Sequence, residues 1–227
     1  MRARTGMAGG AVLALALVAW LLAQGGWRGQ VNAGGFDYYI LALSWMPSYC
    51  EARDDEHIDP RCAPGEGHGW MLHGLWPQHA DGRWPEYCET DQRNPSRQET
   101  AREADLFGVG WAAWHQWNKH GRCSGLSAAD YFALSREALG RVTLPETVTP
   151  PPDGREQGAA LPLETLAAAF ITANPAFDTE MLLATCRDGL IHELRLCLSR
   201  DLSPRPCDEA TRRRACRLDA ARMPLPQ

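Results

Sequence analysis

Eight cysteines constrain the fold of this 227-residue chain more than any other feature of its sequence. They lie between residues 50 and 216, and their number is even, as expected of a disulfide framework formed in an oxidising compartment. The last four are separated by ten, nine and eight residues, which favours a nested pair of bridges near the C-terminus. A zinc cluster is the weaker interpretation because the chain contains no Cys-x-x-Cys.

The first 33 residues have the layout of a secretory signal peptide. Arg2 and Arg4 precede an apolar run over residues 11–23, which is short for a membrane span. Small residues allow cleavage at several points between residues 23 and 33, and an uncleaved membrane anchor is the alternative. The sequence therefore predicts a periplasmic or secreted protein without stable membrane association after cleavage.

The pattern of apolar and turn-forming residues predicts one α+β domain over residues 34–227, with a central antiparallel β-sheet flanked by helices and stapled by disulfides. Buried strands are expected over residues 37–45, 70–75, 181–186 and 190–198. Pro47 and Pro77 end the first two, and Asp188-Gly189 joins the last two as a hairpin. Helices are expected over residues 101–120, 127–139 and 163–173. The remaining long segments, 50–69, 79–100 and 141–162, are interpreted as loops.

The negative net charge excludes the class of proteins that bind nucleic acid through a broad basic surface. The formal net charge is −5, and it becomes −8, from 20 basic and 28 acidic side chains, without the arginines of the leader. A polyanionic substrate must therefore be held by a local positive site. An acidic working pH would help, because it protonates histidines and neutralises carboxylates.

Two short segments gather the residues that carry chemistry. Residues 71–78 read Met-Leu-His-Gly-Leu-Trp-Pro-Gln and contain His73. Residues 114–123 read Trp-His-Gln-Trp-Asn-Lys-His-Gly-Arg-Cys and contain Lys119, the one lysine in a chain with twenty-two arginines. A lysine kept among so many arginines suggests a role that a guanidinium cannot fill.

The second segment places its polar residues on one face if it is helical. His115, Gln116, Lys119 and His120 then fall within an arc of about 140°. Trp114 and Trp117 lie on the opposite side, where we expect both indoles to be buried against the core. Such packing would hold the polar face in place.

Two imidazoles and an ammonium group suit the cleavage of RNA by its own ribose 2′-hydroxyl. A neutral histidine removes the 2′ proton, a protonated histidine delivers a proton to the departing 5′ oxygen, and a fixed cation stabilises the phosphorane. This chemistry requires no metal or other cofactor, and the nucleophile belongs to the substrate.

Both segments resemble the two active-site segments of the ribonuclease T2 family of secreted acid endoribonucleases, and Glu-Leu-Arg-Leu-Cys at residues 193–197 adds to the likeness. The resemblance implies an endoribonuclease that cleaves single-stranded RNA to 2′,3′-cyclic phosphate and 3′-phosphate ends and acts as a monomer. It implies His120 as general base and His73 as general acid. Lys119 and His115 would contact phosphate and the transition state, and Trp76 would stack on a base.

The same resemblance implies how the cysteines pair. Cys88 is expected to bond to Cys123, and Cys186 to Cys216 around an inner bridge from Cys197 to Cys207. Cys50 and Cys62 form the remaining pair.

Gln116 departs from the family, which usually has a catalytic glutamate at this position. An amide can donate a hydrogen bond to a phosphoryl oxygen, but it supplies neither a proton nor a negative charge. Loss of that charge should lower the pKa of the neighbouring cationic groups. We therefore expect a ribonuclease of reduced but real activity.

Two other functions remain open at this point. One is a zinc hydrolase that uses His73, His115 and His120, although zinc pairs on helices are typically four residues apart and these two are five apart. The other is a catalytically silent RNA-binding or inhibitory module on the same fold, prompted by Gln116.

The remaining histidines and tryptophans are given structural roles. His57, His68, His79 and His192 are expected to be core or surface residues, and Trp45, Trp70, Trp84 and Trp111 to pack in the core or on disulfides. The run Arg212-Arg213-Arg214 is interpreted as a solvated face beside acidic residues.

Overall fold

The structure, a computed structural model, describes residues 33–53, 59–145 and 160–226. The expected signal peptide and His57 lie outside these ranges. Within them, no helix has both the length and the apolar character needed to cross a membrane.

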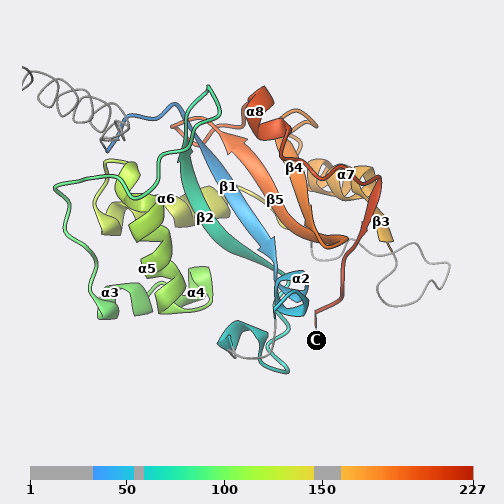
Figure 1. The fold of residues 1–227 in the computed structure, drawn as a ribbon, viewed down its shortest axis with the longest axis horizontal. Coiled ribbons are helices and arrows are strands. Elements are labelled where there is room, and N and C mark those ends of the chain that lie inside the picture. The colour runs from blue at the N-terminus through green and yellow to red at the C-terminus, as the bar shows by residue number, and fades with distance from the viewer. Residues whose placement is uncertain (1–32, 54–58, 146–159, 227) are drawn as a thin grey trace, which may run out of the picture. The chain divides into compact units, whose positions relative to one another are not determined.

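A six-stranded sheet forms the centre of the fold (Figure 1). Strand β1 (Tyr38–Trp45) pairs antiparallel with β2 (Trp70–Gln78) on one side and with β5 (Leu190–Leu198) on the other. Strand β4 (Leu182–Arg187) pairs antiparallel with β5, and the short strands β3 (Ala160–Pro162) and β6 (Ala220–Arg222) pair with each other. The one parallel pairing joins β6 to the start of β5, so the sheet is mixed and not wholly antiparallel as predicted.

Short helices surround the sheet: α2 (Met46–Glu51), α3 (Arg97–Ala101), α4 (Ala104–Phe107), α5 (Gly110–Lys119), α6 (Ala128–Gly140), α7 (Leu163–Ala173) and α8 (Glu209–Arg212), with 3-10 turns η1 (Pro60–Cys62) and η2 (Gly121–Cys123). Helices α3 to α6 gather on the side of the sheet where β2 lies (Figure 1). Trp117 of α5 and Tyr131 of α6 are fully buried there, and the Tyr131 hydroxyl donates to the Leu75 carbonyl at 3.1 Å. These contacts fix α5 and α6 against β2.

The sequence pattern located most elements. The α+β class is confirmed, as are the helices at 128–140 and 163–173 and the hairpin of β4 and β5. Ser127 caps α6 through its hydroxyl, which accepts from the backbone N–H of Asp130.

Other boundaries were wrong, for local reasons. Strand β2 continues through Pro77 because it lies at the edge of the sheet, where a missing N–H is tolerated. The helix expected over residues 101–120 is broken, since Gly108 takes a positive φ of 81° between α4 and α5. Ser96 and Glu99 form a capping box that starts α3 inside the expected loop. Strand β3 likewise lies inside the segment interpreted as irregular.

All four expected disulfides are present. Cys88–Cys123 ties the segment after β2 to the end of α5, and Cys50–Cys62 closes the loop after α2. Cys186–Cys216 and the inner Cys197–Cys207 bridge form the nested pair. These last two hold the C-terminal segment against β4 and β5.

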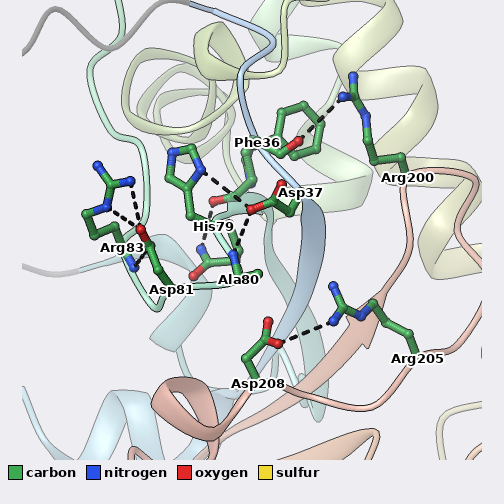
Figure 2. A network of polar contacts seen from close by, with 11 residues as sticks. Phe36, Asp37, His79, Ala80, Asp81, Arg83, Arg200, Arg205 and Asp208 are labelled. Atoms are coloured by element: carbon green, nitrogen blue, oxygen red, sulfur yellow. Dashed lines mark hydrogen bonds and ion pairs between the residues drawn. The ribbon is translucent and has the colours of Figure 1, made fainter.

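The segment that follows β2 is fastened at both ends. The Asp37 carboxylate accepts a hydrogen bond from the backbone of Ala80 at 2.8 Å and lies 3.8 Å from Nδ1 of His79 (Figure 2). Further along, the backbone N–H of Tyr87 donates to the Lys119 carbonyl. The segment is thereby held next to the end of α5.

Candidate active site

His73 is positioned by a buried carboxylate from across the sheet. Its Nδ1 lies 2.5 Å from Oε1 of Glu193, which comes from β5, two strands away from β2. Glu193 is only 1% exposed, and its other oxygen accepts two hydrogen bonds from Arg195 at 2.9 and 2.6 Å. The three side chains form a line from Arg195 through Glu193 to His73.

The charge state of Glu193 follows from these neighbours. Burial by itself raises the pKa of a carboxyl group, but the hydrogen bonds and positive charges of His73 and Arg195 outweigh it and hold the pKa of Glu193 well below its usual range. Glu193 is therefore an ionised carboxylate in the interior.

His120 lies in a contrasting environment. It follows α5 directly, is 6% exposed, and stacks on Trp76 with ring centroids 5.2 Å apart. Burial lowers the pKa of His120 far below its ordinary value, and the nearby positive charge of Lys119 lowers it further. Its Nδ1 is buried and has no hydrogen-bond partner within the described part of the chain. His120 is thus a neutral imidazole.

Trp76 connects the two histidines. Its ring meets His73 edge-on at 5.0 Å and stacks on His120, and the Arg195 guanidinium lies 5.2 Å from its centroid. The indole N–H donates to Oε1 of Gln116 at 3.0 Å. Trp76 is only 9% exposed, and its contacts hold the side chains of His73, His120 and Gln116 in place. Stacking on a base stays a prediction.

A cavity of about 280 Å³ adjoins this cluster. Its lining includes His73, His115 and Gln116, together with His192 from β5 and Trp111 from α5. Burial lowers the pKa of His115, and the charges of Lys119 and His73 act in the same direction. The Nζ of Lys119 lies outside this lining, 3.5 Å from Oε2 of Glu86.

The structure therefore brings His73, Trp76, Gln116 and His120 into one chain of contacts and puts His115 beside them. The expected burial of Trp114 was wrong, since it is 42% exposed while Trp117 is fully buried. The face of α5 that packs on the core carries Ala112, Ala113, Gln116 and Trp117, and Trp114 falls outside it. Trp84 and Trp111, also expected in the core, are 39% and 55% exposed, whereas Trp45 is buried as expected.

Glu193 and Arg195 were not identified as functional residues from the sequence. A signal was present, because both charges lie on the same face of the strand β5, whose other residues are mostly apolar and buried. A charged pair in such a strand must find partners inside the protein.

The zinc alternative finds no support in this geometry. Across residues 33–53, 59–145 and 160–226, no group of three or more His, Cys, Asp or Glu side chains is arranged to hold a metal ion.

Comparison with known proteins agrees with this fold. A model described as the Ribonuclease T2 family matches residues 36–207. A ribonuclease of Aeromonas hydrophila is 34% identical over 139 residues, which cover 59% of this chain and 60% of that protein. A probable ribonuclease of Haemophilus influenzae is 32% identical over 128 residues, which cover 52% of this chain and 47% of that protein. The chain thus spans about half to three fifths of the length of these relatives.

Solved structures share the fold. An RNase-related protein from Calystegia sepium superimposes with a TM-score of 0.65 at 20% identity, covering 85% of this chain and 98% of that one. The structure of RNase NT in complex with 5′-AMP superimposes with a TM-score of 0.60 at 21% identity, covering 84% and 98%. At these identities the likeness concerns the fold alone.

We predict that Gly74→Ala disrupts the site. A Cβ at residue 74 would lie 2.2 Å from Oε1 of Gln116 and 2.4 Å from Nε1 of Trp76, so the hydrogen bond between them must break or shift. We expect a loss of roughly 1–3 kcal/mol in the free energy of unfolding, measured by chemical denaturation. Gly140→Ala is the matched control, because a Cβ there meets nothing within 4 Å and should change stability by less than about 1 kcal/mol. Equal stability of the two variants would contradict the prediction.

Proposed function

Because the chain belongs to the ribonuclease T2 family, we propose that it is a metal-independent endoribonuclease that cleaves single-stranded RNA by attack of the ribose 2′-hydroxyl, giving 2′,3′-cyclic phosphate and then 3′-phosphate ends. The observation that carries this proposal is the pair of histidines in opposite environments around Trp76. One is bonded to a buried carboxylate, and the other is buried without a charged partner that would protonate it.

His120 is the general base in this proposal. A base must be unprotonated before the reaction, and burial keeps this imidazole neutral even at acidic pH. Its stack on Trp76 fixes the plane of the ring. The imidazole can then accept the proton from the 2′-hydroxyl as that oxygen attacks phosphorus.

His73 is the general acid. Its Nδ1 is engaged with Glu193, which leaves Nε2 to deliver a proton to the departing 5′ oxygen. The ionised carboxylate behind it stabilises the imidazolium and fixes the orientation of the ring. Glu193 is thus a positioning residue, and Arg195 keeps it ionised.

Lys119 and His115 stabilise the charge that develops on the phosphorane, and the Gln116 amide can donate to a phosphoryl oxygen. Lys119 lies beside Glu86, an exposed carboxylate that a substrate phosphate would displace. In the second step the roles reverse, and water opens the cyclic phosphate.

Export to the periplasm or the medium is part of the same proposal. Four disulfides within the described residues are typical of a protein that matures in an oxidising compartment. The signal peptide and the monomeric state stay predictions. A silent RNA-binding module on this fold is the second candidate, favoured only by Gln116, and bound but intact RNA in a gel assay would support it.

Replacement of either central histidine tests the proposed reaction. We expect His120→Ala and His73→Ala each to lower kcat/KM on single-stranded RNA by about 10²–10⁴-fold, because each removes one proton transfer. The assay follows the appearance of 2′,3′-cyclic phosphate ends in the presence of a chelator. His68→Ala, whose imidazole contacts the exposed Glu66, should cleave RNA like the unmodified protein. Full activity in either central variant would refute the assignment.

Gln116→Glu should raise turnover. A carboxylate keeps an acceptor for the Trp76 indole and adds a negative charge beside the cationic groups, so we expect a gain of about one to three powers of ten in kcat. Gln116→Leu, which removes the acceptor, should be slower and less stable. Turnover that is unchanged or lower in the glutamate variant would contradict the claim that Gln116 lowers the activity.

Glu193→Gln should change the shape of the pH profile of kcat/KM. An amide carries no negative charge to stabilise the imidazolium that the proposed acid needs, so activity should be lost first where protons are scarce. The loss of activity should therefore be greater at pH 7 to 8 than at pH 5. Glu99→Gln, which affects a surface ion pair with Arg93, is the control. A uniform loss at every pH would indicate a purely structural role for Glu193.

A further inference from the structure

The three consecutive arginines near the C-terminus have different surroundings. Arg212 lies 3.9 Å from Glu180, and Arg213 lies 2.8 Å from Glu209. Arg214 has no ion pair with any described residue, and its guanidinium carbon lies 3.5 Å from the centroid of the Trp84 ring. The solvated face predicted for this run therefore fits the first two arginines and not the third.

The aromatic partner of Arg214 belongs to the segment next to the active site. Trp84 lies in the stretch after β2 that His79 and Ala80 fasten to Asp37 (Figure 2). The same stretch continues to Glu86, which pairs with Lys119. The stack on Trp84 thus holds the Arg214 guanidinium against the segment that follows β2, although the Arg214 side chain remains exposed.

The charge of a second guanidinium acts on Arg214. Partial burial lowers the pKa of Arg214, and the positive charge of Arg195 lowers it further. Arg195 itself lies against the ring of Trp76, which contacts both central histidines. Arg195 therefore carries positive charge beside the central histidines, and this charge also acts on Arg214.

The nearby carboxylates do not neutralise this region. Glu193 is shared between His73 and Arg195, so one negative charge faces two cationic groups when His73 is protonated. Asp208 pairs with Arg205 at 3.4 Å (Figure 2), and Glu86, on the same segment as Trp84, pairs with Lys119. Arg214 thus has no ion pair among the described residues, in a protein whose net charge is negative. An exposed guanidinium in this state is available to bind an anion.

We propose that Arg214, held on Trp84, binds a phosphate group of the RNA other than the one that is cleaved. This inference rests on the proposed function and extends the substrate from a single linkage to a strand of at least two phosphates. A guanidinium suits this task, because its planar N–H groups can donate two hydrogen bonds to one phosphate. It also supplies the local positive site that an acidic protein needs for a polyanion.

The test compares substrates that differ in their number of phosphates. A dinucleoside monophosphate offers the scissile phosphate alone, and an oligonucleotide that contains the same linkage offers several. For Arg214→Met we expect kcat/KM to fall roughly five- to tenfold on the oligonucleotide, and to stay unchanged on the dinucleoside monophosphate. The salt dependence of binding should weaken by about 0.7 in the log–log slope. Arg214→Lys should recover part of the loss because it restores the charge.

Arg212→Met and Arg213→Met are matched controls from the same run and should behave like the unmodified protein on both substrates. An equal loss on both substrates, or no loss on either, would overturn the proposal. Binding of a 2′-deoxy oligonucleotide, which cannot be cleaved, separates the two proposals. If the unmodified protein cleaves no RNA, the proposed function fails. Weaker binding of the deoxy strand by Arg214→Met alone would still support the phosphate site, and unchanged binding would refute it.

Discussion

A buried negative charge on Glu193 is the interaction on which the rest of the site depends. A carboxylate that is 1% exposed is costly to desolvate, and it stays ionised only because His73 and Arg195 both donate to it. These three groups come from two strands separated by β1, so the register of the sheet determines whether they meet. The strand register therefore also determines the surroundings of the proposed acid, since a shift in strand pairing would leave the Glu193 carboxylate buried without partners.

The two central histidines differ because of what surrounds them. His73 faces an ionised carboxylate, whereas His120 is stacked on an indole and close to other cationic groups. Trp76 separates these environments while it touches both rings, and its own position is fixed by Gln116. In the proposed reaction one side-chain type serves as both acid and base, because His73 is bonded to a buried carboxylate whereas burial keeps His120 neutral.

The sequence revealed the parts of the site that lie within short motifs and missed the part that needs long-range pairing. His73 and His120 were found because each is embedded in a distinctive segment of eight to ten residues. Glu193 lies 120 positions from His73, and nothing local to β5 says which strand it will face. Local pattern also failed where tertiary context decides, as for Pro77, which an edge strand tolerates, and for Trp114, which lies outside the face of α5 that packs on the core.

Gln116 shows how a site can keep its architecture while its electrostatics change. The indole of Trp76 needs an acceptor at this position, and an amide oxygen meets that need as well as a carboxylate does. Gly74 leaves room for the same contact, since any Cβ there would collide with both partners. The packing around residue 116 therefore requires a hydrogen-bond acceptor but no charge. In this structure the amide makes the contact with Trp76, so the departure from the family's glutamate bears on the electric field around His115 and His120, and the fold itself gives no reason to expect a silent protein.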